Sequence, residues 1–216
     1  MPRSDQVWAR EAARAAIPTD MLYMIPRVYE SQPAIFYRYG DPLPDFRGCV
    51  VLHARTRDHC RERNWRLAWW HMLARWLFGK GVERLVCIGS PTAAQVVEGA
   101  CDMRAAGLQT QMDILASAWF AVGMSSGPMH LASLCGCPHV VWCGGAQGEW
   151  AATKKRYEHT WNPFDTAVSA NAYNSWQPEP GTVESWVSAF MEKLGGYTDR
   201  DPNKPRRANR GGPVLG

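Results

Sequence analysis

The sequence lacks the features of several protein classes. No apolar run approaches the roughly 20 residues that a membrane-spanning helix needs. The N-terminus is charged and has no apolar core of signal-peptide length, so we expect a cytoplasmic protein. The chain also contains neither G-x-G-x-x-G nor G-x-x-x-x-G-K-S/T. Their absence argues against dinucleotide-binding and P-loop chemistry.

The seven cysteines are an odd number in a chain that shows no signal peptide, so we expect reduced thiols rather than disulfides. Cys135, Cys137 and Cys143 lie close in sequence to His130 and His139, which could suggest zinc. The Cys-x-Cys spacing differs from that of the usual zinc knuckle, however. Buried free thiols account for the group without a metal, and we expect no metal site.

The net charge of +4 does not predict a nucleic-acid-binding face. Most of the positive surplus lies in residues 197–216, which are rich in Pro, Gly, Asn and Arg and predict a disordered basic tail. A nucleic-acid-binding protein would instead carry a basic face on its folded domain. The remaining composition, 46% hydrophobic and 20% charged, is typical of a globular protein.

Residues 49–196 alternate apolar runs with helical periodicity and predict a single α/β domain. We expect strands over residues 49–53, 84–88, 119–122 and 138–143, and helices over residues 65–79, 92–98, 108–118, 128–135 and 182–194. This order is typical of a parallel sheet with helices on both faces. Residues 146–180 read as a loop. Residues 1–48, with one short helix over 4–16, are broken by prolines and predict an irregular lead-in.

Ligands bind at the carboxyl ends of the strands in open parallel sheets, so the loops after the strands are candidate sites. The first such loop, residues 54–64, contains four arginines, Arg55, Arg57, Arg61 and Arg63. A guanidinium group can donate two parallel hydrogen bonds to oxygens of one phosphate, so this loop could hold a phosphate. The alternative is a solvated charged loop, because Asp58 and Glu62 partly neutralise it.

The second candidate loop, residues 123–130, joins a strand to a helix. Ser125 and Ser126 can cap the helix, Gly127 allows close backbone approach, and Pro128 suits the first helical turn. The free N–H groups at such a helix start attract an anion. Alternatively, the small residues serve tight packing and His130 is structural. A third loop, residues 144–149, follows the last strand and could line the same crevice.

Residues 113–145 resemble the donor-binding half of glycosyltransferase family 9, which includes the lipopolysaccharide heptosyltransferases. The family hallmark runs G-x-D-S/T-G-P-M-H-L-A and then G-x-P-x-V. The matching residues are Gly123, Ser126, Gly127, Pro128, Met129, His130, Leu131, Ala132, Gly136 and Pro138. Residues 63–65 resemble the K-x-W of the family, and the whole resemblance spans about 49–145. It implies a GT-B architecture in which a nucleotide-sugar lies against a Rossmann-like domain.

The resemblance also implies site residues. Ser125, Ser126, Gly127, Met129 and His130 would hold the donor phosphates or sugar, with Arg55 and Arg63 balancing their charge. Three departures stand out: Ser125 replaces an acidic residue, Arg63 replaces a lysine, and the N-terminal domain is reduced to about 48 residues. His53 and Arg55 also resemble the His-x-Arg of fucosyltransferase-like relatives. The short lead-in would then be a remnant of that domain or a wall of the acceptor site.

We therefore expect a metal-independent glycosyltransferase that uses a nucleotide-sugar as substrate and needs no cofactor. His53 and Asp58 are the candidate bases for deprotonating a hydroxyl acceptor. The alternative is a non-catalytic nucleotide-sugar-binding module, or the donor half of a split transferase completed by a partner subunit or a second copy. On that alternative, the isolated chain binds donor but transfers sugar slowly.

Overall fold

The computed structural model describes residues 40–144, 154, 157–158, 162 and 166–196. Its centre is a six-stranded sheet in the order β3-β2-β1-β4-β5-β6, and every pair of neighbouring strands is parallel. The strands are β1 (Val50–His53), β2 (Leu85–Cys87), β3 (Cys101–Asp102), β4 (Phe120–Met124), β5 (His139–Gly144) and β6 (Val168–Tyr173). The α/β fold class predicted from the sequence is confirmed, with the strand order of a Rossmann-like sheet.

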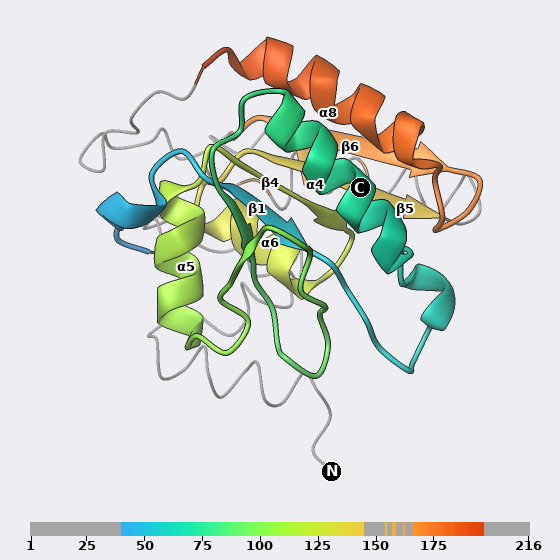
Figure 1. Cartoon of the computed structure of the whole chain (residues 1–216), viewed down its shortest axis with the longest axis horizontal. Coiled ribbons are helices and arrows are strands. Elements are labelled where there is room, and N and C mark those ends of the chain that lie inside the picture. The colour runs from blue at the N-terminus through green and yellow to red at the C-terminus, as the bar shows by residue number, and fades with distance from the viewer. Residues whose placement is uncertain (1–39, 145–153, 155–156, 159–161, 163–165, 197–216) are drawn as a thin grey trace, which may run out of the picture.

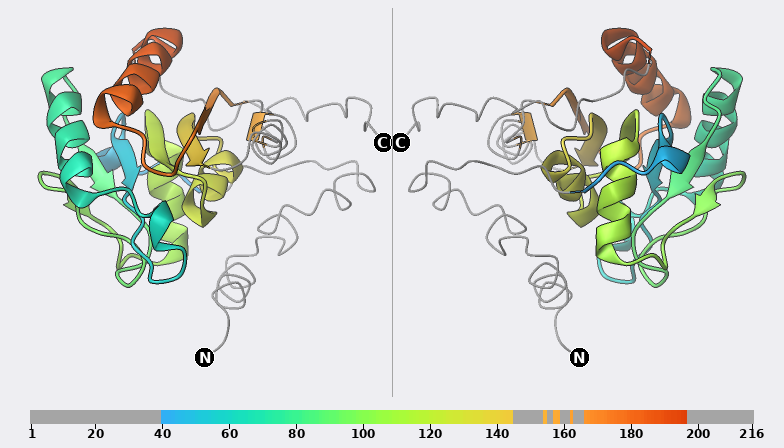
Figure 2. Two further views of the ribbon diagram at one scale, coloured as in Figure 1. Left: turned by 90° about the vertical axis from the view of Figure 1, so that its right-hand side faces the viewer. Right: turned by 90° about the vertical axis from the view of Figure 1, so that its left-hand side faces the viewer.

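Helices cover both faces of this sheet (Figure 1). The α-helices of the fold are α4 (Leu67–Gly79), α5 (Leu108–Ser117), α6 (Gly127–Leu134) and α8 (Pro180–Leu194). In the side views of Figure 2, α4 and α8 lie on one side of the strands and α5 and α6 on the other. Two short 3-10 helices, η1 (Pro44–Phe46) and η2 (Arg61–Arg63), precede β1 and α4.

The two layers of helices bury two separate hydrophobic clusters. Successive strand side chains point to opposite faces, so Val51 packs with α5 and α6 whereas Val50 and Leu52 pack with α4 and α8. Every residue of β1, β2, β4 and β5 is buried. This explains why these four strands read as continuous apolar runs in the sequence.

Tryptophans fill the cluster under α4 and α8. The ring centroid of Trp65 lies 5.0 Å from that of Trp70 and 5.5 Å from that of Trp142, both in edge-to-face arrangements. All three side chains are almost fully buried. Edge-to-face aromatic pairs add about 0.5–1.5 kcal/mol beyond area burial. This packing joins the start of α4 to β5.

One predicted helix is wrong. Residues 92–98 form turns and extended chain, because Ala94 makes an antiparallel bridge with Arg55. The Gln95 N–H donates to the Ala54 carbonyl at 2.8 Å, and the Thr56 N–H donates to the Ala93 carbonyl at 2.8 Å. These bonds hold the segment against the loop that follows β1. Pairing with a distant loop has therefore overridden a weak local helical pattern.

Smaller differences lie at other elements. The sequence did not predict β3, and the loop expected over 146–180 is wrong where β6 forms. At the end of α4, it is Gly81 and not Gly79 that adopts positive φ, at 85°. The predicted helix over 4–16 and the basic tail lie outside the described residues.

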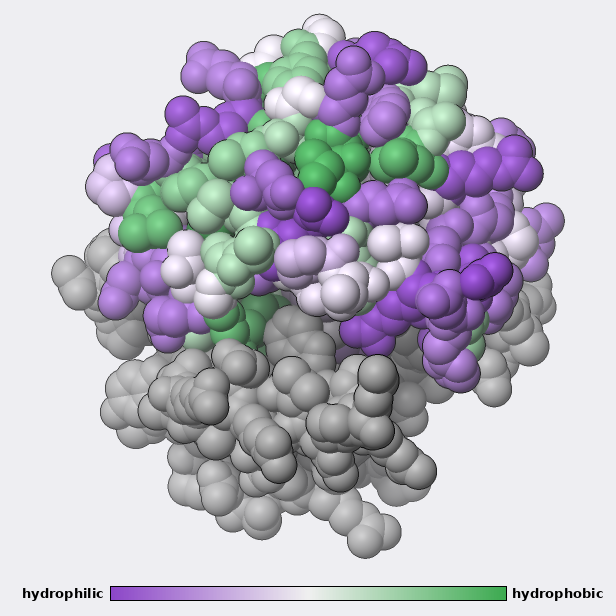
Figure 3. Space-filling view, turned by 60° about the horizontal axis from the view of Figure 1, so that its bottom comes forward, coloured by the Kyte–Doolittle hydropathy of each residue, from purple (hydrophilic) through white to green (hydrophobic). Residues whose placement is uncertain are grey.

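The described helices include none that is long and apolar enough to span a membrane. The large hydrophobic side chains most exposed among the described residues are Met72, Phe78 and Val96, each about two-fifths exposed. On the face shown in Figure 3, hydrophobic residues are interspersed with hydrophilic ones over the part that the structure describes.

Candidate functional site

The strand order reverses between β1 and β4, and this is where open α/β sheets bind ligands. The two strands are paired in register, with His53 opposite Gly123 at their carboxyl ends. The loop after β1 and the turn after β4 therefore leave the sheet side by side. These are two of the three loops that the sequence singled out; of the third, residues 144–149, only Gly144 is among the described residues.

Gly123 lets α6 begin close to β4. A Cβ atom on Gly123 would lie only 2.6 Å from the Met129 Sδ. The Met129 side chain is 1% exposed and packs in the core cluster of α5 and α6. The predicted donor contact of Met129 would thus have to come from its backbone, because its side chain is committed to this packing.

The start of α6 is open on its outer side. Ser126 is the N-cap residue, as predicted, but it makes no side-chain cap bond. Its hydroxyl instead donates to the Met124 carbonyl at 2.9 Å. Gly127 is exposed, and a Cβ atom added to it would meet nothing within 4 Å. Exposed backbone and the positive end of the helix dipole thus lie together just after the carboxyl end of β4.

Tyr157 is a site residue that the sequence did not reveal. It is fully buried, and its hydroxyl lies 3.2 Å from Ser125 Oγ and 3.3 Å from His130 Nε2. Its ring stacks on the His130 imidazole with centroids 4.8 Å apart. Burial raises the pKa of Tyr157 above its usual value, so the phenol stays protonated. Burial, and then the charge of His139, lower the pKa of His130 to about 3, so the imidazole stays neutral.

Arg55 and Arg63 point in different directions. The Arg55 side chain is largely buried and donates to the His59 carbonyl at 2.8 Å, to the Cys60 carbonyl at 3.2 Å and to Asn64 Oδ1. Burial, followed by the charge of Arg57, lowers the pKa of Arg55. These bonds show Arg55 holding its own loop in shape.

Arg63 lies at the surface of the same loop. Its guanidinium carbon stands 4.6 Å from the centroid of the Trp176 ring, and its side chain is 44% exposed. Asp58, the predicted alternative base, is almost fully exposed and pairs with Arg61 at 2.7 Å. Arg63 Nε also lies 4.0 Å from the Glu62 carboxylate. The loop therefore carries one cation supported by a ring and two surface ion pairs.

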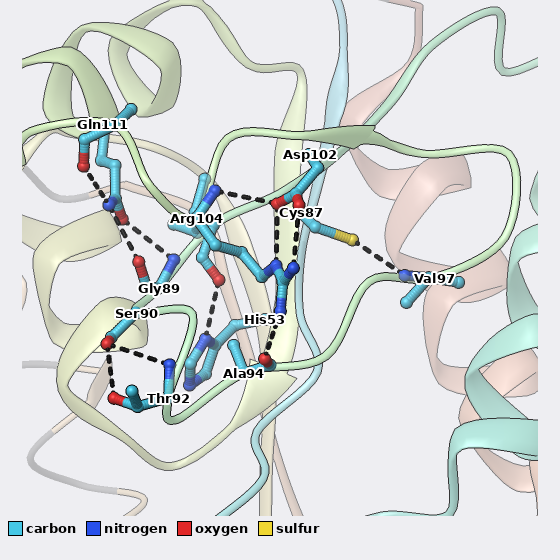
Figure 4. Close-up of polar contacts among 12 residues, drawn as sticks. His53, Cys87, Gly89, Ser90, Thr92, Ala94, Val97, Asp102, Arg104 and Gln111 are labelled. Atoms are coloured by element: carbon cyan, nitrogen blue, oxygen red, sulfur yellow. Dashed lines mark hydrogen bonds and ion pairs between the residues drawn. The ribbon is translucent and has the colours of Figure 1, made fainter.

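His53 ends β1 beneath the end of β2 (Figure 4). Its Nδ1 lies 3.2 Å from the Ile88 carbonyl, and a Cβ on Gly89 would press on the imidazole at 3.0 Å. Only 4% of His53 is exposed. Burial, aided by Arg57 and Arg55, lowers its pKa to about 4. The Nδ1 proton donates to Ile88, which leaves Nε2 as the acceptor of a neutral ring.

Polar groups also order the carboxyl ends of β2 and β3 (Figure 4). The buried Gln111 amide accepts from the Gly89 N–H and donates to the Gly89 carbonyl, both at 2.9 Å. Arg104 binds both carboxylate oxygens of Asp102, at 2.7 and 2.8 Å, and donates to the Ala94 carbonyl at 2.7 Å. Nothing in the local sequence pattern had predicted this network.

The cysteines considered for zinc lie inside the fold. Cys135, Cys137 and Cys143 are buried in the core cluster of α5 and α6. His139 is fully buried, with Nδ1 2.9 Å from the Cys137 carbonyl, and burial lowers its pKa to about 4. Within the described ranges, no three His, Cys, Asp or Glu side chains are grouped to hold a metal.

A groove of about 700 Å³ lies at the opposite end of the strands, where their amino ends are. Its lining includes Arg47, Glu83, Arg84 and Trp119, which precede the strands β1, β2 and β4. Because it opens at the amino ends of the strands, it is separate from the crevice between β1 and β4.

Comparisons with known proteins support the fold. No protein-family profile and no curated protein matches the sequence. The E. coli ADP-heptose LPS heptosyltransferase II matches with a TM-score of 0.51 and 14% identity, over 70% of this chain and 48% of that one. The E. coli heptosyltransferase WaaC with ADP gives a TM-score of 0.48 and 18% identity, over 77% and 47%. The chain therefore spans about half the length of these enzymes, and its described domain has a heptosyltransferase-like fold.

Proposed function

We propose that the crevice between β1 and β4 binds the diphosphate of a nucleotide-sugar, and that the chain is the donor-binding part of a glycosyltransferase. One observation carries this proposal: the start of α6, with Gly127 open to solvent, lies at the reversal of strand order beside the arginine loop. A diphosphate needs hydrogen-bond donors and positive charge, and this edge supplies the exposed Gly127 backbone at the positive end of α6 and the Arg63 guanidinium.

The leaving nucleoside diphosphate develops negative charge as the sugar departs. The positive end of α6 and the Arg63 guanidinium would stabilise that charge, so the proposed mechanism uses no metal ion. Ser125, Ser126 and His130 border the same turn and would contact the phosphates or the neighbouring sugar. Arg55 would act indirectly by holding the loop that carries Arg63.

The proposed mechanism also needs a base for the acceptor hydroxyl. His53 is neutral and lies at the strand end, but its pKa of about 4 makes Nε2 a weak base at neutral pH. Asp58 is an exposed carboxylate on the arginine loop. We propose Asp58 as the first residue to test and His53 as the second.

The first test is nucleotide binding, and ADP is the first probe because the heptosyltransferase II neighbour is named for ADP-heptose. We expect ADP, UDP or GDP to raise the unfolding temperature, since a ligand that binds only the native state stabilises it. The corresponding nucleosides should have much smaller effects. If no nucleoside diphosphate binds at millimolar concentration, the donor-site proposal is wrong.

Arg63→Ala should weaken ADP binding by about 1.5–3 kcal/mol, the usual size of a charge-assisted contact. Adenosine binding should be unchanged, because the proposed contact is with phosphate. Calorimetry with both ligands measures the difference. Arg75→Ala on α4 is the matched control, since Arg75 is an exposed arginine near a carboxylate, 3.9 Å from Glu98. Equal losses for ADP and adenosine would show that Arg63 only supports the fold.

A second candidate function is donor binding without transfer by this chain alone. The observation that favours it is that the described residues form a single six-stranded sheet, with the proposed diphosphate site at the carboxyl ends of its strands. We expect calorimetry to detect donor binding, and transfer from ADP-heptose to a panel of acceptors to be slow. Loss of acceptor positioning can raise a barrier by about 7–11 kcal/mol. Rapid transfer by the purified monomer would exclude this alternative.

A further inference from the structure

The segment between β6 and α8, residues 174–179, lies against the arginine loop from a distant part of the chain. We call it the β6–α8 linker. It is fixed at one end by β5, because a Cβ atom on Gly144 would lie 2.2–2.3 Å from the Ser175 and Trp176 backbone. At the other end, the buried indole of Trp65 donates to the Pro178 carbonyl at 2.7 Å. The linker is therefore anchored on both sides of Gln177.

The Gln177 side chain forms hydrogen bonds with the backbone on either side of Arg63. Its side-chain Nε2 donates to the Glu62 carbonyl at 2.9 Å and to the Asn64 carbonyl at 2.9 Å. The amide has two N–H groups, and each is used for one of these carbonyls. The Gln177 amide thus joins the linker to both chain neighbours of Arg63.

The adjacent residue of the linker supports the Arg63 side chain itself. Trp176 places its ring 4.6 Å from the Arg63 guanidinium. The ring is also packed against both hydrophobic clusters, so it is a firm platform. A free arginine side chain loses up to about 2 kcal/mol of rotamer entropy when a ligand fixes it. Holding it beforehand reduces that cost.

We infer that Gln177 and Trp176 are positioning residues that present Arg63 to the diphosphate of the donor. This inference rests on the proposed function, because it assigns a task to Arg63 in that site. It adds that diphosphate affinity depends on the β6–α8 linker, which lies far from both predicted loops in the sequence. A purely structural role of the linker would affect all ligands and the fold equally.

The test is a double-mutant cycle between Gln177→Leu and Arg63→Ala, with ADP and adenosine as probes in calorimetry. Leucine has a similar size but cannot bond the two carbonyls. We expect Gln177→Leu to weaken ADP binding about three- to tenfold. In the Arg63→Ala background it should have almost no effect, and adenosine binding should not change in either background.

Gln109→Leu is the matched control, because Gln109 is a surface glutamine whose Nε2 donates to Asp113 at 2.9 Å. It should leave ADP binding unchanged. A second pair of variants tests the platform: Trp176→Phe should retain most of the ADP affinity, because it keeps an aromatic face, whereas Trp176→Ala should not. Circular dichroism and thermal unfolding establish that each variant is folded.

The outcomes separate this inference from the proposed function. If the wild-type chain does not bind ADP, the ADP donor site is wrong and the inference falls with it. If ADP binds and Arg63→Ala weakens it, but Gln177→Leu does not, the donor site stands and the inference is overturned. The inference is also overturned if Gln177→Leu weakens ADP and adenosine binding equally. It is overturned as well if Gln177→Leu weakens ADP binding as much in the Arg63→Ala background as in the wild type.

Discussion

Gly127→Val is expected to reduce ADP affinity at least about 100-fold, equivalent to roughly 3 kcal/mol. Gly127 occupies the first turn of α6, where the proposed diphosphate would approach the backbone. The two methyl groups of valine would stand between the ligand and the helix N–H groups. The site would then lose charge-assisted bonds, each of which contributes about 1.5–3 kcal/mol. Calorimetric titration of both proteins with ADP measures the effect.

The space around Gly127 is open: apart from its chain neighbours, an added Cβ atom meets nothing within 4 Å, and Gly127 does not have positive φ. Because Gly127 precedes Pro128, a β-branched side chain there also disfavours the helical backbone, so Gly127→Ala is measured beside Gly127→Val and circular dichroism checks that both proteins are folded. Gly181→Val provides the control, since Gly181 lies in the first turn of α8 next to Pro180 and also has open space around it. If a folded Gly127→Val protein keeps its ADP affinity, the turn is not the binding site.

The free energy of unfolding is expected to fall steeply as the pH drops from about 6.5 to 4. His53 and His139 are buried and their pKa values are lowered to about 4, and the pKa of His130 is lowered to about 3. In the unfolded chain all three would titrate near pH 6.5. Within this window the unfolded state binds more protons, so stability rises with pH and is lost on acidification. For the three histidines together the slope reaches about 4 kcal/mol per pH unit.

Urea unfolding curves at half-unit pH steps from 7.5 to 4 would measure this slope. His139→Gln removes one of the three titrations and should reduce the slope by about a third. The matched control is His71→Gln: His71 lies on the half-exposed side of α4, 4.0 Å from Glu98. That change should leave the slope almost as it is in the wild type. A flat stability profile between pH 6.5 and 5 would contradict the neutral, buried state of His53 and His139.

The sequence predicted the buried strands well and the edge strands poorly. The apolar runs around β1, β2, β4 and β5 are continuous because both faces of these strands are covered. β3 contains only Cys101 and Asp102, both exposed, so it has no hydrophobic signal. β6 is only partly buried and mixes Ser, Ala and Asn with Val and Tyr. Pairing with a formed sheet, rather than local preference, makes these two segments strands.

The sequence likewise predicted one part of the candidate site and missed another. A local motif identified the turn from Ser125 to His130, because helix caps, glycine and proline have meaning over a few residues. Tyr157 contacts that turn from a distance of 27 residues along the chain, and Gln177 contacts the arginine loop from a distance of 113. No local pattern encodes such contacts. The inward direction of Arg55 was hidden for the same reason, since it depends on the folded shape of its loop.

The strand order also constrains how this domain can assemble. β1 lies inside the sheet, yet one of its two neighbours is β4, so Val50 must meet Phe120 before the centre of the sheet is complete. Contacts between residues so far apart carry a loop-closure cost and slow folding. During synthesis, β1, β2 and α4 leave the ribosome well before β4. Until β4 arrives, one edge of β1 has unpaired backbone N–H and C=O groups and its apolar side chains are incompletely covered, and this nascent half-sheet is where chaperones would be expected to bind.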